Sequence, residues 1–410
     1  METHLADFIR DTPEGQEADR ILRTCVHCGF CLATCPTYQL LGDELDSPRG
    51  RIYLIKQMLE NAPVTEKTLA HLDRCLTCRS CESTCPSGVQ YGKLVDIGRH
   101  IAEEKVGRSV AANLQRKAMR AVLSEPGRIG PLVKLSQLAR PLLPGPLRKN
   151  VPEYQSAGAW PAPRHGRKML VLAGCVQPSL APNINAAAAR VLDRLGISLI
   201  VAPQAGCCGA LSYHLNAQDE ALDFMRRNID AWLPHIEAGV EAIVMTASGC
   251  GVTVREYGHY LRHDPVYAEK AKRISDLTRD VSEVVLAETD KLAALIQAAA
   301  KKTEGKVAVH TPCTLQHGQK LNGLLEKILA AAGLELTVSS DRHLCCGSAG
   351  TYSILQKELS GQLLKNKVAA LETGSPAQIV TANIGCLMHL KSGSGLPVSH
   401  WVELIDRLLV

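Results

Sequence analysis

The chain has 410 residues, of which 46% are apolar and 21% are charged, as in a globular protein with a packed core. A net charge of +5 is small for this length, and we interpret it as solvated surface charge, not as a nucleic-acid-binding face. The sequence holds no apolar run of the roughly 18 residues that span a membrane, and its charged N-terminus lacks the apolar region of a secretory signal.

Two cysteine motifs of identical spacing come first along the chain. One holds Cys25, Cys28, Cys31 and Cys35, and the other holds Cys75, Cys78, Cys81 and Cys85. Disulfides are not expected in a cytoplasmic protein, so metal ligation is the leading interpretation. In two-cluster ferredoxins, three cysteines of such a motif bind one [4Fe–4S] cluster and the fourth binds the other. The predicted ligand sets are Cys25, Cys28, Cys31 and Cys85 for the first cluster, and Cys75, Cys78, Cys81 and Cys35 for the second. Zinc fits less well, because its sites generally join two cysteine pairs in one centre.

The segment between the motifs predicts a helix over residues 47–60, with Ser47 as its cap and Pro48 at its first position. Its apolar face would consist of Ile52, Ile55 and Leu59. A second helical stretch is predicted from about 94 to 123. We assign residues 1–125 to a mostly helical, α+β ferredoxin-like domain that holds both clusters.

Residues 126–167 are predicted to be a proline-rich basic linker. The prolines are Pro131, Pro141, Pro144, Pro146, Pro152, Pro161 and Pro163, and the basic residues in and beside the linker are Arg140, Arg148, Lys149, Arg164, Arg167 and Lys168. Proline breaks regular structure, so an ordered surface linker is one interpretation. The other is a docking segment for a partner or for an anionic membrane face.

A second, longer repeat fills the rest of the chain. Cys175, Cys207, Cys208 and Cys250 recur as Cys313, Cys345, Cys346 and Cys386, at offsets of 138, 138, 138 and 136. Strands are predicted within 168–175, 198–203, 241–250, 306–313, 334–340 and 377–386, with helices between them. Alternating strands and helices favour parallel sheets, with the cysteines just past the carboxyl ends of the strands. We therefore predict two duplicated α/β modules that face each other, over residues 168–300 and 301–410.

Each module offers four soft ligands, enough for one further cluster. The glycine after each Cys-Cys pair permits the sharp turn that brings both thiols to one site. Buried structural cysteines are the alternative interpretation. Among the nearby histidines, His310, His317 and His343 are expected to form hydrogen bonds or to lie in the core, whereas His389 stays open as a helping ligand.

The segments "CVHCGFCLATCPTYQLLGDELDSPRGRIYLIKQ", "AGCCGALSYHLNAQ", "HLCCGSAGTY" and "TANIGC" resemble the iron–sulfur subunits of glycolate oxidase (glycolate dehydrogenase) over nearly the whole chain. The C…CCG…C pattern also resembles the CCG modules of heterodisulfide reductase. Those modules commonly end in C-x-x-C, but Thr253 and His389 stand at the last position here, so the five-thiol cluster of that enzyme is not carried over. The resemblance implies an electron-transfer subunit of an oxidoreductase that is not catalytic alone.

The remaining expectations concern partners. No G-x-G-x-x-G, P-loop or G-x-S-x-G motif is present, so we expect no flavin on this chain and FAD-containing glycolate oxidase subunits as partners. Electrons would pass from the two N-terminal clusters to the modules and then to a quinone or another acceptor. The protein is expected in the cytoplasm, with attachment to the inner face of the membrane left open. Alternatives are a subunit of a lactate or glycerol-3-phosphate dehydrogenase, a self-contained heterodisulfide-reductase-like enzyme, and a zinc-stabilised interaction module.

Overall fold

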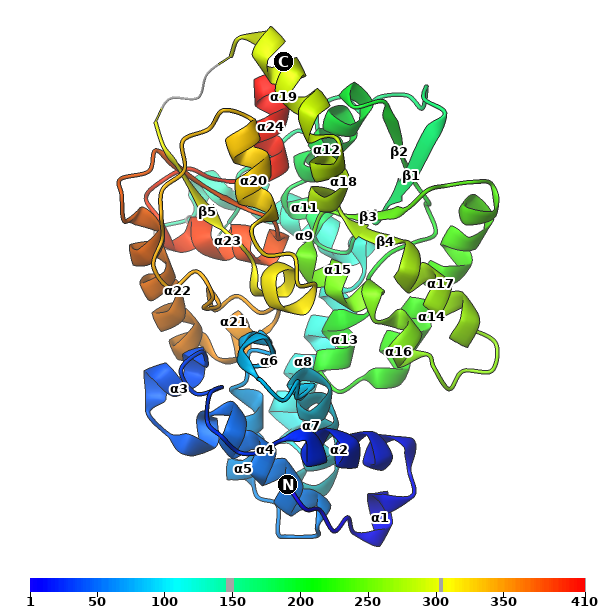
Figure 1. The fold of residues 1–410 in the computed structure, drawn as a ribbon, viewed down its shortest axis with the longest axis vertical. Coiled ribbons are helices and arrows are strands. Elements are labelled where there is room, and N and C mark those ends of the chain that lie inside the picture. The colour runs from blue at the N-terminus through cyan, green and yellow to red at the C-terminus, as the bar shows by residue number, and fades with distance from the viewer. Residues whose placement is uncertain (145–150, 302–304, 410) are drawn as a thin grey trace.

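The computed structural model describes residues 1–144, 151–301 and 305–409. Figure 1 shows the N-terminal helices (blue) below two α/β modules, the first in green and the second in orange and red. Pro146, Arg148 and Lys149 of the predicted linker lie outside the described residues. None of the helices in the described ranges has the length and hydropathy of a membrane span.

The N-terminal part, residues 1–144, contains helices and loops but no strand, so the β component of the predicted α+β domain is not seen. Its helices are α1 (Asp7–Arg10), α2 (Pro13–Thr24), α3 (Pro36–Leu41), η1 (Glu44–Asp46), α4 (Pro48–Leu59), α5 (Glu66–Asp73), α6 (Ser80–Thr84), α7 (Tyr91–Val106), α8 (Val110–Leu123), α9 (Pro126–Ala139) and η2 (Arg140–Leu142). The helix predicted over 47–60 is confirmed as α4, and the Ser47 Oγ accepts a hydrogen bond from the Gly50 N–H at 2.9 Å.

Two predictions in this region need correction. The single helical stretch expected over 94–123 is two helices, because Gly107 has a φ of 75° and ends α7. The linker was expected to lack regular structure from Pro131 onward, but α9 continues through Pro131 to Ala139. A proline six positions into a helix removes one backbone hydrogen bond, and in α9 the helix tolerates that loss.

The first module is a four-stranded parallel sheet with helices around it. Its elements are β1 (Arg167–Val171), α11 (Gln177–Leu180), α12 (Asn183–Arg194), β2 (Ile197–Val201), α13 (Ala210–His214), α14 (Gln218–Glu237), β3 (Ile243–Met245), α15 (Ser248–Arg255), α16 (Tyr257–Tyr260), α17 (Ala268–Leu277), β4 (Thr278–Asp280), α18 (Val281–Ala287) and α19 (Thr289–Ala299). The strand order is β2-β1-β3-β4, and every pair is parallel.

The second module repeats this plan with three parallel strands in the order β5-β6-β7. Its elements are β5 (Val307–His310), η3 (Thr314–Gly318), α20 (Leu324–Ala331), α21 (Tyr352–Leu355), α22 (Lys357–Glu372), β6 (Gln378–Thr381), α23 (Ile384–Gly393), β7 (Val398–His400) and α24 (Trp401–Leu409). The strand predicted over 334–340 is reduced to a single bridge between Val307 and Leu336. Two backbone hydrogen bonds with Val307 hold Glu335 and Thr337 at the edge of β5, and beyond them the chain leaves the sheet, where Val338 is 86% exposed.

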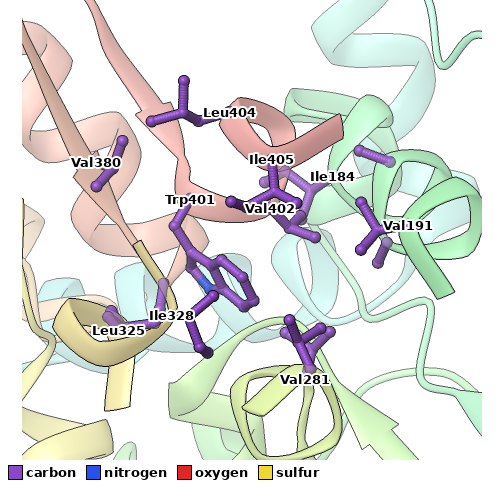
Figure 2. Packing of buried hydrophobic residues seen from close by; sticks show 14 of the residues in the cluster. Ile184, Val191, Val281, Leu325, Ile328, Val380, Trp401, Val402, Leu404 and Ile405 are labelled. Carbon is purple, nitrogen blue, oxygen red and sulfur yellow. The ribbon is translucent and has the colours of Figure 1, made fainter. Parts of the chain in front are cut away.

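One hydrophobic core joins the two modules. Ile184 and Val191 of α12 belong to the same buried cluster as Trp401 and Ile405 of α24 (Figure 2). An ion pair between Arg190 and Asp406, with a closest distance of 2.6 Å, lies beside this contact. The modules therefore bury part of their apolar surface against each other, whereas a second buried cluster, with Leu170, Met225 and Trp232, is formed by the first module alone.

Candidate metal centres

The first N-terminal thiol set combines one cysteine of the second motif with three of the first. Cys25, Cys28, Cys31 and Cys85 line one small cavity beside α4. Burial raises the pKa of Cys25, and the nearby thiols of Cys85 and Cys28 raise it further. Burial likewise raises the pKa of Cys31 to about 11, with Cys25 as a further cause. Four thiols gathered in one cavity suit a metal cluster, which would bind them as thiolates.

The second N-terminal thiol set combines three cysteines of the second motif with one of the first. Cys35, Cys75, Cys78 and Cys81 line a neighbouring cavity between α3 and α6. Burial holds the pKa of Cys81 well above its usual range, and the Cys78 and Cys75 thiols add to this effect. Cys81 lines both cavities, so the two sets lie side by side.

Matched backbone turns bring the thiols of each motif to one side. His27 and Gly29 have φ values of 59° and 85°, and Thr77 and Arg79, fifty residues later, have values of 51° and 58°. The Thr77 N–H lies 3.4 Å from the Cys75 Sγ and donates to it. Left-handed conformations of non-glycine residues cost energy and concentrate at functional sites. Their repetition in both motifs supports a shared ligand geometry.

Two buried arginines that the sequence analysis did not identify contact the second set. Arg99 of α7 donates to the backbone carbonyl oxygens of Leu72, at 3.1 Å, and of Cys75. Arg51 of α4 is 1% exposed and pairs with Asp46 at 3.1 Å. Both arginines lie on helices far from the cysteines in sequence, so only the fold reveals this contact.

In the first module, the cysteines lie just past the carboxyl ends of the strands. Cys175 follows β1, Cys207 and Cys208 follow β2, and Cys250 lies in α15 after β3. Cys175 and Cys208 perturb the pKa of the Cys207 thiol, and Cys250 that of the Cys208 thiol, so these side chains lie close together. The four thiols thus form one continuous group.

The turn between the adjacent cysteines and the next helix requires glycine. Gly209 has a φ of 91°, and a Cβ there would lie 2.8 Å from the Ala221 carbonyl oxygen. Gly347 has a φ of 93°, and its Cβ would lie 2.7 Å from the Ser360 carbonyl oxygen. Helices α14 and α22, each the second helix after its glycine, therefore pack directly on these turns.

The second module gathers Cys313, Cys345, Cys346 and Cys386 in the same way. The Cys313 and Cys345 Sγ atoms are 3.8 Å apart, and Cys346 contacts both Cys345 and Cys386. His317 bonds to the Ser83 hydroxyl and the His343 carbonyl, and His389 to the Ser360 hydroxyl. All sixteen cysteines of the chain are free thiols, so no disulfide competes with metal binding.

The positions where a fifth cysteine would stand are occupied by hydrogen-bonded side chains. The Thr253 hydroxyl donates to the Gly249 carbonyl at 3.2 Å, within α15. His389, on α23, lies 3.2 Å from Ser360 through its Nε2. In the second module, the buried ligand atoms that lie close together are those of His310, Cys346 and Cys386, and His389 is not among them.

A cavity of about 360 Å³ lies where the N-terminal part and the two modules meet. Its lining includes Cys75, Cys78, Cys175, Cys207, Cys208, Cys250, Cys313, Cys345 and Cys386. Burial raises the pKa of Cys78 well above its usual range, and the nearby Cys313 thiol raises it further. The two modules face each other here, with a hydrogen bond of 3.2 Å from the Ser248 N–H to the Ala382 carbonyl. Three of the four thiol sets therefore open on one space.

The sequence matches two protein families and several known relatives. Residues 21–89 match the family described as "4Fe-4S dicluster domain", and residues 169–255 and 307–391 match "Cysteine-rich domain". The chain is 54% identical to the glycolate oxidase iron-sulfur subunit of Escherichia coli (strain K12) over 410 residues, 100% of this chain and 99% of the relative. It is 32% identical to the probable glycolate oxidase iron-sulfur subunit of Bacillus subtilis (strain 168), with coverages of 91% and 89%. Lactate utilization protein A of Bacillus licheniformis is 27% identical over 58% of this chain.

Proposed function

Since this chain belongs to the family of glycolate oxidase iron–sulfur subunits, we propose that it carries electrons away from a partner subunit that oxidises glycolate to glyoxylate. The observation that supports this proposal best is the convergence of the thiol sets on one cavity. Iron–sulfur clusters held by such thiolates accept and release single electrons. The chain's own contribution is to hold the thiolates, to keep water away from most of them and to fix their order in space.

We assign the cluster ligands from the cysteines that line each cavity or lie together in each module. The first cluster is assigned to Cys25, Cys28, Cys31 and Cys85, and the second to Cys75, Cys78, Cys81 and Cys35, which is the crossed pairing of two-cluster ferredoxins. Cys81 lines both cavities, and this closeness of the two thiol sets supports the crossed pairing. Further metal centres are assigned to Cys175, Cys207, Cys208 and Cys250, and to Cys313, Cys345, Cys346 and Cys386. The proximity of Cys78 to Cys313, which line the same cavity, supports an order from the first set to the second and then to the second module.

The partner must supply the chemistry that thiolate-bound iron lacks. Oxidation of a hydroxy acid removes two electrons as a hydride or its equivalent, and a flavin performs that step. We therefore propose FAD-containing glycolate oxidase subunits as partners, and a quinone or another carrier as the acceptor.

We further propose that the chain attaches to the inner face of the cytoplasmic membrane through α9 and η2. Leu132, Leu135, Leu138 and Leu142 form a stripe along these helices and are between 53% and 88% exposed. Arg128 and Lys134 of α9 are exposed, and the sequence holds no acidic residue from 126 to 152. An apolar stripe flanked by basic residues suits an anionic lipid surface. Such attachment would place the chain beside a membrane quinone.

The test of this function is reconstitution. The purified chain alone should not reduce a dye with glycolate, whereas the chain added to its flavin subunits should support glycolate-dependent reduction of a short-chain quinone. A matched preparation with Cys78→Ser should lose the quinone reduction and keep direct dye reduction by the flavin subunits. Dye reduction by the isolated chain, or turnover of lactate in place of glycolate, would contradict the proposal.

A further inference from the structure

The second module differs from the first at two buried positions next to its cysteines. His310 on β5 pairs in register with Thr381 on β6. The cysteine offsets of 138 and 136 relate them to Leu172 and Met245 in the first module. Leu172 and Met245 lie in an apolar cluster together with Cys208. A polar pair in the second module thus replaces an apolar pair in the first, beside equivalent thiols.

The geometry around His310 is that of a ligand set. A ring nitrogen of His310 and the Sγ atoms of Cys346 and Cys386 lie within 4.8 Å of one another, and all three residues are buried. Tetrahedral sites with bonds of about 2.0–2.3 Å to nitrogen and sulfur place their ligands at roughly 3.3–3.8 Å from one another. Small side-chain shifts would therefore close the three atoms around one metal ion.

A hydrogen bond at one ring nitrogen fixes the orientation of the His310 imidazole. The His310 Nδ1 lies 2.8 Å from the Thr381 hydroxyl, and Thr381 is 0% exposed. Within the described residues, the other ring nitrogen, Nε2, has no hydrogen-bond partner. Metal-binding histidines usually have one nitrogen held in this way, which fixes the tautomer and directs the second nitrogen at the metal.

We propose that His310 is a nitrogen ligand, together with Cys346 and Cys386, of a metal centre in the second module. This inference rests on the proposed binding of metal by that module. Imidazole and thiolate together suit zinc and iron, and oxygen-preferring cations are disfavoured. The first module has Leu172 at the matching position, so its centre would have thiolate ligands alone.

A buried lysine makes the second centre different in charge as well. Lys367 on α22 is 4% exposed, and its Nζ donates to the Asp341 carbonyl at 2.7 Å. Its positive charge lies near Cys345 and Cys346. In the first module, the neutral Asn228 of α14 contacts the Cys207 carbonyl. Because a neutral nitrogen ligand and a nearby cation both disfavour loss of an electron, an iron centre here would have a higher reduction potential than its counterpart.

The direct test is an experimental structure of the anaerobically purified full chain, with anomalous data at the iron and zinc edges. We expect metal density about 2.0–2.1 Å from the His310 Nε2. The edge data would tell zinc from iron. Metal held by the thiolates with the imidazole outside bonding distance would overturn the role of His310 alone. A second module without metal would overturn both this inference and the proposed cluster in that module.

Variants give an independent readout in metal content per chain. His310→Leu copies the first module and should lower the metal bound by the second module at least tenfold in affinity. His310→Cys should retain the metal but lose the nitrogen ligand, as X-ray absorption would show. His317→Gln is the matched control, because it alters a buried histidine of the same module that already has two hydrogen bonds. Unchanged metal content in a folded His310→Leu protein would contradict the inference, and if that variant fails to fold, an unchanged nitrogen signal in His310→Cys would do so.

Discussion

The electrostatic surroundings of the second thiol set come from residues that no local motif contains. Arg99 is 7% exposed and also donates to the Thr77 hydroxyl at 2.9 Å, so it holds the loop that carries Cys75 and Cys78. Arg51 places a second guanidinium close to Cys75 and Cys35. Buried cations stabilise thiolates, which repel one another when they are brought together.

The crossed ligand assignment can be tested at single cysteines. Cys85→Ser should alter the same paramagnetic signal as Cys28→Ser, and Cys35→Ser the same signal as Cys78→Ser. Each variant should lose up to about four irons per chain, because one ligand of one four-iron cluster is removed. Electron paramagnetic resonance of the reduced protein gives the comparison. A Cys85→Ser spectrum that matches Cys78→Ser would show that each motif binds its own cluster.

The glycine after the second Cys-Cys pair should be intolerant of a side chain. In Gly347→Ala the new Cβ meets the Ser360 carbonyl oxygen at 2.7 Å in addition to the unfavourable φ. Gly350→Ala is the matched control, since its φ is also positive but nothing lies within 4 Å of the added atom. The control should cost about 1–2 kcal/mol, and Gly347→Ala about 1–3 kcal/mol more. Equal midpoints in chemical unfolding would argue against close packing of α22 on this turn.

At the scale of elements, the sequence predicts best where a signal is local. The cap and apolar face of α4, and strands β1, β2, β3, β5 and β6, were all predicted from short patterns and are confirmed. β4 and β7 were missed, because three-residue strands with the sequences TRD and VSH carry no alternation. The role proposed for His310 was also missed, because its partners lie 36 to 76 residues away in sequence. The ligand assignments and domain boundaries remain predictions.

The apolar stripe on α9 gives a prediction about membranes. Leu135 and Leu138 are 65% and 78% exposed. Replacing both by glutamate should lower binding to vesicles that contain anionic lipid at least about tenfold, since burial of each leucine stabilises by about 1.5–3 kcal/mol. Co-sedimentation would measure it. Val338→Glu, at a position outside the stripe that is 86% exposed, should bind like the parent protein. Unchanged binding of the double variant would assign the stripe to a protein partner instead.

At the scale of the whole molecule, ion pairs and hydrogen bonds attach the N-terminal part to both modules. Arg79, at the start of α6, forms two hydrogen bonds with Glu256 of the first module, at 2.6 and 2.8 Å. His317 of the second module bonds to Ser83 of α6 at 2.9 Å. A single short helix therefore contacts both modules, so its position fixes the distance between the second thiol set and the central cavity.

Removal of Glu256, the partner of Arg79, should weaken the contact between α6 and the first module. In Glu256→Ala the Arg79 side chain, 12% exposed in the pair, loses its carboxylate. Breaking one partner of a largely buried pair should lower the free energy of unfolding by about 2–4 kcal/mol. Asp7→Ala removes the exposed pair with Arg10 and should have no measurable effect. Urea unfolding of anaerobic protein compares the two, and similar midpoints would show that the Arg79 pair does not stabilise the contact.

The shared core of the two modules has a consequence for biosynthesis. The core around helix α12 is complete only when α24 packs against it. The Arg190–Asp406 pair beside this contact joins residues that are 216 positions apart in the sequence. At about 5–20 residues per second, a ribosome needs roughly 10–40 s to add that length. During this interval α12 can already pack on β2, but the part of its surface that contacts α24 has no partner. The nascent chain thus exposes the apolar surface between the modules until the last helix covers it.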